Sequence, residues 1–381
     1  MDIINKNTVI FFINASKGTG QFARLESAAK ALLESHNVIW VSPEQEQAVN
    51  GINYFRSVKD FANDVDNSNP IELIFSSESD ILRNLLGITY LKSKYRHVKI
   101  TFMQRIDSFT NYVFNFKKSF SLNIFLRVIS FPLIIFISSL LVNKYIFQTP
   151  FAMKDYFLKN NLSCFFIAIF FKTNTQLYIL PNNSGIEWNS TFQRKTILKN
   201  KNESADNSKR KIVYIGNMQY YGKGIDTLLK AYKQLDPSLY KIIFIGKIPK
   251  QFIKKIDYIA SKASESTFDI EFLGHKKTPH NFLNDSKTLY VSASRLDLCP
   301  NSLLEALEFN IPILVSDIDA HKYIIRDKKL IFSKNNANAL ASKVSALFDN
   351  KKIWDENTNS VSESFKRFDF NWAVKFVMLM D

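Results

Sequence analysis

The fold is decided by a strand–turn–helix stretch at residues 212–232, IVYIGNMQYYGKGIDTLLKAY. Its first residues form a continuous apolar run that ends in glycine, which is typical of a strand buried on both faces of a parallel sheet. The helix expected after the GKG turn places Ile225, Leu228 and Leu229 on one face. A buried strand followed by an amphipathic helix is the unit from which doubly wound sheets are built.

The same alternation runs along most of the chain. Because parallel strands need crossover helices, we expect an α/β protein with two Rossmann-like, doubly wound domains facing a central cleft. In such folds ligands bind beyond the carboxyl ends of the strands. The other predicted strands are TVIFFIN (8–14), NVIWVS (37–42), IELIF (71–75), VKITFM (98–103), YIFQT (145–149), LYILP (177–181), KIIFIG (241–246), IEFLG (270–274), LYVSA (289–293) and PILVS (312–316).

A polar segment separates the two series of strands. A chain of 381 residues exceeds what one hydrophobic core usually organises, so two domains are expected. Residues 183–210 are charged and lack helical periodicity, which indicates a linker. We therefore expect an N-terminal Rossmann-like domain at 1–182 and a C-terminal Rossmann-like domain at 211–365. A helix at 366–381 is expected to cross back to the N-terminal domain.

The formal net charge of +15 is concentrated in one block of the chain. Residues 92–172 contain 12 Lys or Arg and only two acidic residues, whereas residues 1–91 contain seven basic and eleven acidic residues. The block includes 16 uncharged residues between Arg127 and Lys144, fewer than the roughly 20 that a spanning helix needs. With Lys117 and Lys118 nearby, this segment predicts a helix that lies on an anionic membrane surface. An ordinary buried helix is the alternative.

Other partners and compartments are disfavoured by the composition. No nucleic-acid recognition motif is present, so we expect no nucleic-acid partner. The two cysteines, Cys164 and Cys299, lie far apart, which argues against a disulfide framework or a structural zinc site. The first residues lack the pattern of a secretory signal, so we expect a cytoplasmic protein.

Two carboxylates are spaced around a turn in LDLCPNSLLEALEFNIP, residues 296–312. Asp297 and Glu305 are eight positions apart. Ser302 with Glu305 has the spacing of a capping box, which would make Glu305 a structural residue. Alternatively, the helix start offers the backbone N–H groups of Asn301, Ser302 and Leu303 to a diphosphate, because a helix amino terminus binds anions. The residues alone leave both interpretations open.

An ordered set of stretches in the second half resembles family 4 glycosyltransferases, which are retaining enzymes of the GT-B fold. The resemblance covers roughly residues 210–375 and is weaker in the first half. It is carried by IVYIGNMQYYGKGIDTLLKAY (212–232), IEFLG (270–274), LYVSASRLDLCPNSLLEALEFNIPILVSD (289–317) and FDFNWAVKF (368–376).

The resemblance implies that the domain at 1–182 is the acceptor-side domain and that the domain at 211–365 binds the nucleotide sugar. It also implies roles for several residues. Glu305 corresponds to the carboxylate that holds the ribose, and Asp297 to the one that contacts the transferred sugar, where most members have Glu. Lys223 corresponds to the lysine that neutralises the donor diphosphate. Asn217 stands where the family has an arginine, so one cation is missing, and Arg295 is a candidate substitute.

Further residues follow from the same resemblance. Gly18 and Gly20 belong to the loop that positions donor and acceptor, although a plain turn would explain these glycines equally well. Gly216 belongs to the donor-binding set. Arg105 and Asp107 follow a predicted strand where the family places sugar or acceptor contacts, and an ion pair that closes the loop is the alternative.

Together these features predict a hexosyltransferase-type glycosyltransferase in surface polysaccharide or O-antigen-type biosynthesis. It would move a sugar from a nucleotide-sugar donor to a lipid-linked saccharide at the inner face of the plasma membrane. No cofactor and no metal are expected, and SDIDA (316–320) is not interpreted as a metal site. The alternatives are a nucleotide-sugar 2-epimerase of the same architecture and an inactive membrane-bound assembly partner.

Overall fold

The computed structural model divides the chain into two compact units, Met1–Pro181 with Asn371–Asp381 and Asn182–Phe370. We call them unit 1 and unit 2. The structure describes residues 6–12, 20–42, 52–61, 69–104, 122–158, 175–185, 209–217, 222–249, 252–253 and 269–380. Most of the expected linker, residues 186–208, lies outside this part.

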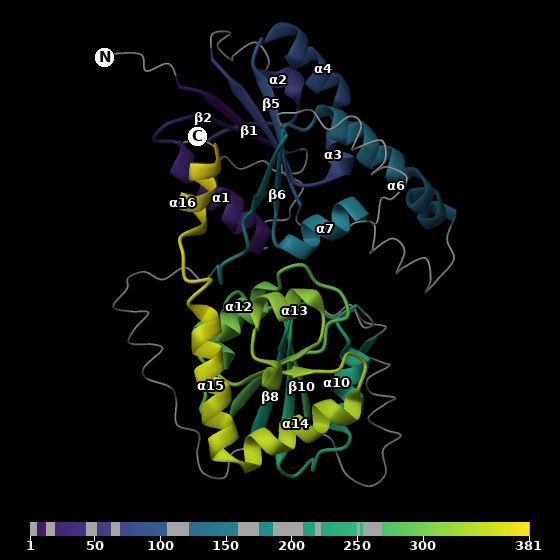
Figure 1. Ribbon diagram of the computed structural model, residues 1–381, viewed down its shortest axis with the longest axis vertical. Helices are drawn as coiled ribbons and strands as arrows, with labels where there is room; N and C mark the ends of the chain where they lie inside the picture. Colours follow the sequence, from purple (N-terminus) through teal and green to yellow (C-terminus); the bar gives the residue numbers. More distant parts are fainter. Residues whose placement is uncertain are drawn as a thin grey trace. The chain divides into compact units, whose positions relative to one another are not determined.

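Unit 1 is built on a parallel sheet of seven described strands in the order β3-β2-β1-β4-β5-β6-β7 (Figure 1). The central strands are almost wholly buried apolar runs, as a sheet covered on both faces requires. The strands are β1 (Thr8–Phe12), β2 (Asn37–Val41), β3 (Asn53–Phe55), β4 (Ile71–Phe75), β5 (Val98–Met103), β6 (Lys144–Phe147) and β7 (Gln176–Ile179).

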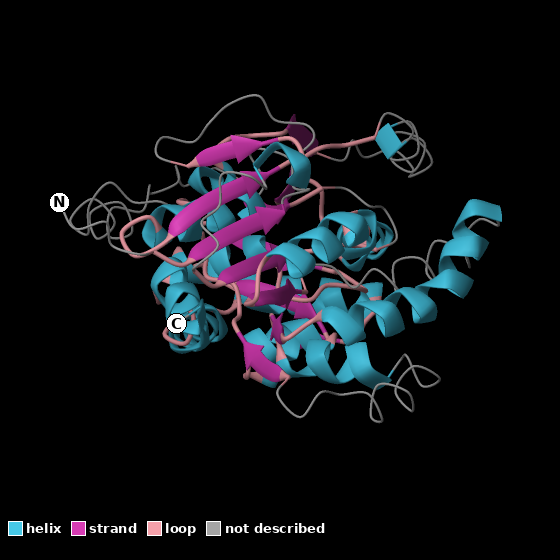
Figure 2. Ribbon diagram, turned by 90° about the horizontal axis from the view of Figure 1, so that it is seen from above, coloured by secondary structure: helices cyan, strands magenta, loops and turns pink. Residues whose placement is uncertain are grey.

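Helices cover both faces of this sheet, which Figure 2 shows as a twisted layer of strands between helices. One face packs into a core with helices that include α3, α4 and α6. The described helices of unit 1 are α1 (Gly20–Leu32), α2 (Val58–Phe61), α3 (Glu78–Arg83), α4 (Leu85–Lys94), α6 (Leu122–Leu141), α7 (Pro150–Leu158) and α16 (Trp372–Met380).

The other face is covered by α1 and by α16, which comes from the end of the chain. The two helices pack against each other and lie side by side in Figure 1. The ring centroid of Phe376 in α16 lies 6.0 Å from that of Phe11 in β1, and Phe11 lies 6.0 Å from Trp40 in β2. Residues 371–381 therefore complete the unit begun by residues 1–181.

Unit 2 contains a parallel sheet of six described strands in the order β10-β9-β8-β11-β12-β13. Numbered from its own first strand, this is the 3-2-1-4-5-6 order of a Rossmann fold. The strands are β8 (Arg210–Ile215), β9 (Tyr240–Ile245), β10 (Ile270–Gly274), β11 (Thr288–Ser292), β12 (Ile313–Ser316) and β13 (Ile331–Phe332).

Successive residues of β8 point to opposite faces and fill two cores. Ile212 and Tyr214 pack with α10 and α14, whereas Val213 and Ile215 pack with α12 and α15. The helices of unit 2 within the described ranges are α10 (Ile225–Tyr232), η1 (Pro279–Leu283), α12 (Asn301–Glu308), α13 (Asp319–Ile324), η2 (Lys328–Leu330), α14 (Ala337–Asp349) and α15 (Lys351–Phe365).

The apolar segment of the basic block forms the helix α6. No helix in the described ranges is both long and apolar enough to cross a membrane. Lys144, expected to flank this segment at a membrane, is only 7% exposed. Its ammonium lies 3.6 Å from Glu72 and donates to the carbonyl of Leu379, so the prediction that Lys144 faces a membrane is wrong.

Candidate functional site

The candidate site lies where the strand order of unit 2 reverses. β8 and β11 are neighbours in the sheet, yet the chain leaves them toward helices on opposite faces. At such a switch point the two outgoing loops separate and leave room for a ligand. The loop after β8 carries Lys223, and the loop after β11 carries Asp297. The two loops therefore bring two of the predicted residues to the same edge of the sheet.

The loop that carries Lys223 is seated directly against the loop after β11. Gly224 adopts a left-handed conformation with φ +64°, and a Cβ there would lie 1.9 Å from the carbonyl oxygen of Ala293. Only glycine permits both the backbone conformation and this approach. The backbone N–H of Arg295 also donates to the carbonyl of Gly222 at 2.9 Å. The turn is thus held on both sides of Lys223.

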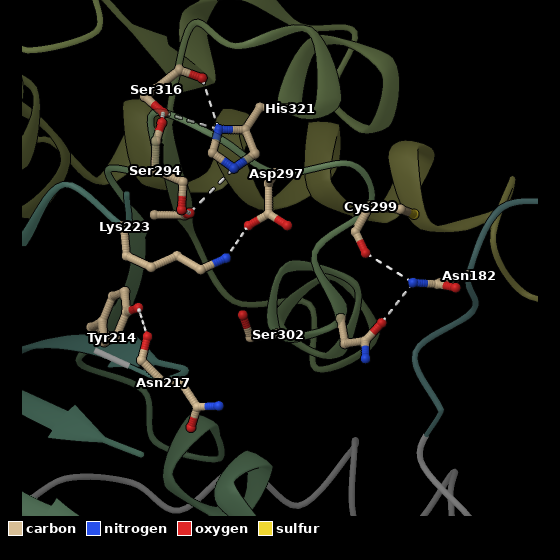
Figure 3. A network of polar contacts seen from close by, with 12 residues as sticks. Asn182, Tyr214, Asn217, Lys223, Ser294, Asp297, Cys299, Ser302, Ser316 and His321 are labelled. Atoms are coloured by element: carbon tan, nitrogen blue, oxygen red, sulfur yellow. Dashed lines mark hydrogen bonds and ion pairs between the residues drawn. The ribbon is translucent and has the colours of Figure 1, made fainter. Parts of the chain in front are cut away.

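Lys223 and Asp297 form an ion pair across 74 positions of sequence. The ammonium nitrogen lies 2.5 Å from Asp297 Oδ2, and the side chains are 26% and 17% exposed, respectively (Figure 3). The pair is thus half-buried but open to a ligand. Neither residue predicts the other in the sequence, because they belong to different loops.

The helix α12 begins two residues earlier than the capping-box interpretation requires. Pro300 is its N-cap and contributes no side-chain hydrogen bond, so the capping-box prediction for Ser302 and Glu305 is wrong. The hydroxyl of Ser302 instead lies 2.9 Å from that of Tyr290. The first helical hydrogen bond is donated by the backbone N–H of Leu304 to the carbonyl of Pro300. The amides of residues 301–303 therefore precede the helical hydrogen bonds, as an anion-binding helix end requires.

Glu305 lies one turn into α12, near the same buried tyrosine. Its residue is half-buried and its Oε2 atom is buried. Burial raises the pKa of Tyr290, and the charges of Asp297 and Glu305 raise it further, while the hydrogen bond with Ser302 lowers it. Both carboxylates therefore act on one phenol, although eight residues separate them in the chain.

Asn182 holds the turn that leads into α12. It is 4% exposed, and its Nδ2 donates to the carbonyl of Cys299 at 2.9 Å and to Asn301 Oδ1 at 2.8 Å (Figure 3). The sequence analysis did not select this residue. The available signal was a pair of polar amides directly after the apolar run LYILP, where a strand of this fold ends.

A buried histidine lies beside the ion pair. The imidazole of His321 in α13 donates from Nδ1 to the carbonyl of Ser316 at 2.8 Å, since a carbonyl can only accept. Its Nε2, which must then accept, lies 3.2 Å from the hydroxyl of Ser292. Desolvation lowers the pKa of His321 to about 4, with Lys223 contributing, while the bond to Ser316 and the charge of Asp297 oppose this. The ring is therefore neutral near pH 7.

The remaining donor-side residues behave differently from one another. Gly216 has φ +146°, and a Cβ on the neighbouring Gly246 would lie 2.0 Å from its carbonyl oxygen, so the ends of β8 and β9 approach closely. Asn217 is exposed, and its carbonyl accepts a long hydrogen bond of 3.4 Å from Tyr214.

Arg295 is bonded to Asp226 through both guanidinium NH₂ groups, so the structure does not present it as a second phosphate cation.

Few of the site residues that were predicted in unit 1 lie in the described part of the chain. Gly20 is the first residue of α1. Gly18, Arg105 and Asp107 lie outside the described residues. Within the described ranges, no group of three or more His, Cys, Asp or Glu side chains could hold a metal ion.

Comparisons with known proteins relate residues 195–365 to a sequence family and the whole chain to a known fold. Residues 195–365 match the family model described as "Glycosyl transferases group 1". No curated protein matches the chain in sequence.

Among solved structures, sucrose-phosphate synthase from Thermosynechococcus elongatus is 14% identical with a TM-score of 0.69, and 98% of each chain is covered. Alr3699/HepE from Anabaena, in complex with UDP and glucose, is 11% identical with a TM-score of 0.66, and 98% of each chain is covered. The lipopolysaccharide outer core galactosyltransferase WaaB is 12% identical with a TM-score of 0.65, covering 97% of this chain and 98% of that one. Residues 195–365 are thus similar to the group 1 glycosyl transferases, and the chain as a whole has the GT-B fold.

Proposed function

We propose that the chain is a retaining hexosyltransferase that moves a sugar from a nucleotide-sugar donor to a lipid-linked saccharide in surface polysaccharide biosynthesis. The observation that carries this proposal is the Lys223–Asp297 pair at the switch point of unit 2, where α12 also begins. The family match over residues 195–365 supports it. The complexes of Alr3699/HepE with UDP and with UDP-glucose support a nucleotide-sugar donor.

The donor diphosphate would lie between Lys223 and the amides of residues 301–303. Because the side chains of Lys223 and Asp297 are partly exposed to water, their ion pair contributes only about 1 kcal/mol. A diphosphate carries more charge than one carboxylate, so it would displace Asp297 from Lys223. The freed carboxylate of Asp297 could then accept hydrogen bonds from the hydroxyls of the sugar, while Glu305 would accept those of the ribose.

The chemistry requires stabilisation of charge on the leaving nucleotide. As the bond between the anomeric carbon and the phosphate oxygen breaks, the acceptor oxygen bonds to that carbon on the same face. The acceptor proton passes to the departing phosphate oxygen, so no protein nucleophile is needed. Lys223 and the amide end of α12 would stabilise the developing negative charge without a metal.

Lys223→Ala tests the donor site. We expect nucleoside diphosphate affinity and transfer to fall by about tenfold or more, because a charged hydrogen bond is lost. The measurement is calorimetric titration with UDP, GDP and ADP, followed by sugar transfer with the ligand that binds. Lys329→Ala is the matched control, since Lys329 is an exposed lysine of unit 2 paired with Glu356.

Glu305→Gln extends the test to the ribose. It keeps the shape of the side chain and removes the charge, so we expect weaker binding of a nucleotide but unchanged binding of inorganic pyrophosphate.

Conversion of a nucleotide sugar without any acceptor would favour the epimerase, and a wild-type protein that binds no nucleotide would favour the assembly partner.

The acceptor proposal rests on the surface of unit 1. Among the side chains of α6 whose exposure the structure describes, three leucines are exposed: Leu122 at 63%, Leu133 at 60% and Leu140 at 38%. Leu133 and Leu140 are seven positions apart and so share one face of the helix. Exposed leucines on a helix within a basic block suit a surface-lying contact with an anionic membrane, where a lipid-linked acceptor would be found.

Leu133→Ser with Leu140→Ser tests this contact. We expect the double variant to lose binding to vesicles that contain an anionic lipid, measured by co-sedimentation. Ile135 is fully buried and is left unchanged, because its replacement would damage the core. Leu239→Ser, at a 48% exposed leucine of unit 2, is the control, and undiminished sedimentation of the double variant would contradict the proposal.

A further inference from the structure

The guanidinium of Arg295 joins its own loop to the start of α10 and to the loop after β13, at the carboxyl edge of the unit 2 sheet. Nη1 and Nη2 donate to the two carboxylate oxygens of Asp226 at 2.6 and 2.8 Å. Nη2 also donates to Thr227 Oγ1 at 3.0 Å, and Nε donates to Asn335 Oδ1. Arg295 follows β11, Asp226 is in the first turn of α10, and Asn335 follows β13.

These bonds hold Arg295 in one geometry. The side chains of Arg295 and Asp226 are only 15% and 14% exposed, so water screens the pair less than a surface pair. A planar guanidinium that donates to both oxygens of one carboxylate fixes orientation as well as distance. Asp226 also neutralises the positive charge, which makes Arg295 a poor phosphate ligand in this position.

The backbone of the same segment supports the turn that carries Lys223. Arg295 N–H donates to the Gly222 carbonyl at 2.9 Å, and Gly224 lies against the Ala293 carbonyl. Two residues beyond Arg295 is Asp297, which accepts from Lys223 at 2.5 Å. The Arg295 network therefore connects the base of α10 to the loop that carries the partner of Lys223.

We propose that Arg295 is a positioning residue that holds the turn of Lys223 against the loop of Asp297, and that it does not contact the donor phosphates. The inference deepens the proposed donor site and rests on it for its effect on nucleotide binding. The contact between the two loops is a property of the protein without a ligand and can be tested separately.

The first experiment measures the chemical reactivity of Lys223. The amine is dimethylated with isotopically labelled formaldehyde and quantified by mass spectrometry, with Lys329 of the same sample as the reference. Arg295→Ala should raise the labelling rate of Lys223 relative to Lys329 by about fivefold or more. The reason is that the loop of Asp297 loses its support, so the Lys223 amine is released from its ion pair more often. Asp226→Asn should act in the same direction. An unchanged Lys223 rate in both variants overturns the proposal.

The second experiment distinguishes positioning from direct phosphate contact. UDP affinity is measured by calorimetry for the wild type, Arg295→Ala, Arg295→Lys and Asp226→Asn. A positioning role predicts that all three variants bind UDP more weakly, by about tenfold for the alanine variant. If Arg295 contacted the phosphates, Asp226→Asn would release its charge and strengthen UDP binding, which overturns the proposal.

Two further outcomes are informative. Arg295→Lys keeps the charge but cannot donate to both carboxylate oxygens from fixed positions, so wild-type labelling and affinity in this variant would also overturn the proposal. It replaces Arg295→Ala if the alanine variant does not fold. A wild-type protein that binds no UDP, with Lys223 still more reactive in the variants, would contradict the choice of donor and leave the positioning role supported.

Discussion

At the scale of single residues, the site combines a partly exposed ion pair with one buried histidine. Lys223 and Asp297 are partly exposed and can exchange partners, whereas His321 is fully buried. Figure 3 shows the three side chains gathered at the end of the sheet. The neutral ring joins the ends of β11 and β12 through Ser292 and Ser316, and so fixes the strands from which the site loops depart.

The buried histidine predicts a loss of stability in mild acid. The pKa of His321 is lowered from 6.5 to about 4 in the folded protein, first by burial. The unfolded chain therefore binds a proton below pH 6.5 that the folded protein does not bind until about pH 4. The free energy of unfolding is therefore highest above pH 6.5, and protonation of the unfolded chain lowers it by about 2 kcal/mol at pH 5.

The measurement is urea unfolding of the wild type and of His321→Gln from pH 7 to pH 5. The wild type should lose more free energy of unfolding than the variant over this range. His280, whose pKa is also lowered by burial, is present in both proteins and cancels in the comparison. Parallel pH curves for the two proteins would show that His321 is not the group responsible.

The residues of the site were predictable in kind, but their partners were not. The spacing of Asp297 and Glu305 left two interpretations open, and the resemblance to family 4 glycosyltransferases selected both residues and Lys223 as candidates for the donor site. The bond between Lys223 and Asp297 depends on two loops that meet only in the folded sheet. Arg295 was expected to supply a phosphate cation, because the sequence does not show that Asp226 would take up its charge.

At the scale of elements, the strands were predicted better than the helix ends. The runs at 71–75, 98–103 and 270–274 coincide with β4, β5 and β10, since continuous apolar runs are what a covered parallel sheet requires. The strands β3 and β13 were missed. β3 lies at a sheet edge with a partly exposed pattern, and β13 has two residues, so neither produces such a run.

The start of α12 shows why a local motif can mislead. Ser302 and Glu305 have capping-box spacing, but Pro300 occupies the N-cap and Tyr290 engages the serine hydroxyl. The end of the helix follows the general rule that a residue in the left-handed conformation terminates a helix, because Asn310 has φ 49°. Asparagine tolerates this region better than most residues.

The clamp on the turn before α12 gives a prediction at this scale. Asn182→Asp keeps the size of the side chain but replaces the donor Nδ2 with an oxygen that faces two acceptors. We expect a loss of about 1–3 kcal/mol in the free energy of unfolding, because the Cys299 carbonyl and Asn301 Oδ1 lose their donor. Nucleotide affinity should fall as the helix start shifts.

Urea unfolding and calorimetric titration of the same preparations provide the measurement. Asn338→Asp is the control, since Asn338 makes an exposed side-chain hydrogen bond with Gln234 in unit 2. A variant with lower stability and wild-type nucleotide affinity would mean that the clamp supports the fold without shaping the donor site.

At the scale of the whole molecule, the chain closes its first unit with its last helix. Phe376 is fully buried in α16, where it contacts Phe11 and stacks on Trp372 at 5.2 Å. Phe376→Ala should lower the free energy of unfolding of unit 1 by about 3–5 kcal/mol, the usual cost of truncating a buried phenylalanine. Met378→Ala, in the same helix but 68% exposed, should have little effect. The measurement is chemical unfolding followed by the fluorescence of Trp40 and Trp372, in a background that carries Trp188→Phe and Trp354→Phe so that unit 1 alone is observed.

The position of α16 also has a consequence during synthesis. Residues 182–370 leave the ribosome before α16 does, so unit 2 can finish folding while β1 and α1 still lack their cover. The nascent first unit then presents Phe11 and Trp40 to any chaperone that binds aromatic surfaces. That surface is covered only after residues 372–380 have been synthesised and α16 has docked on α1, so the docking of α16 is the step that releases the chain from such a chaperone.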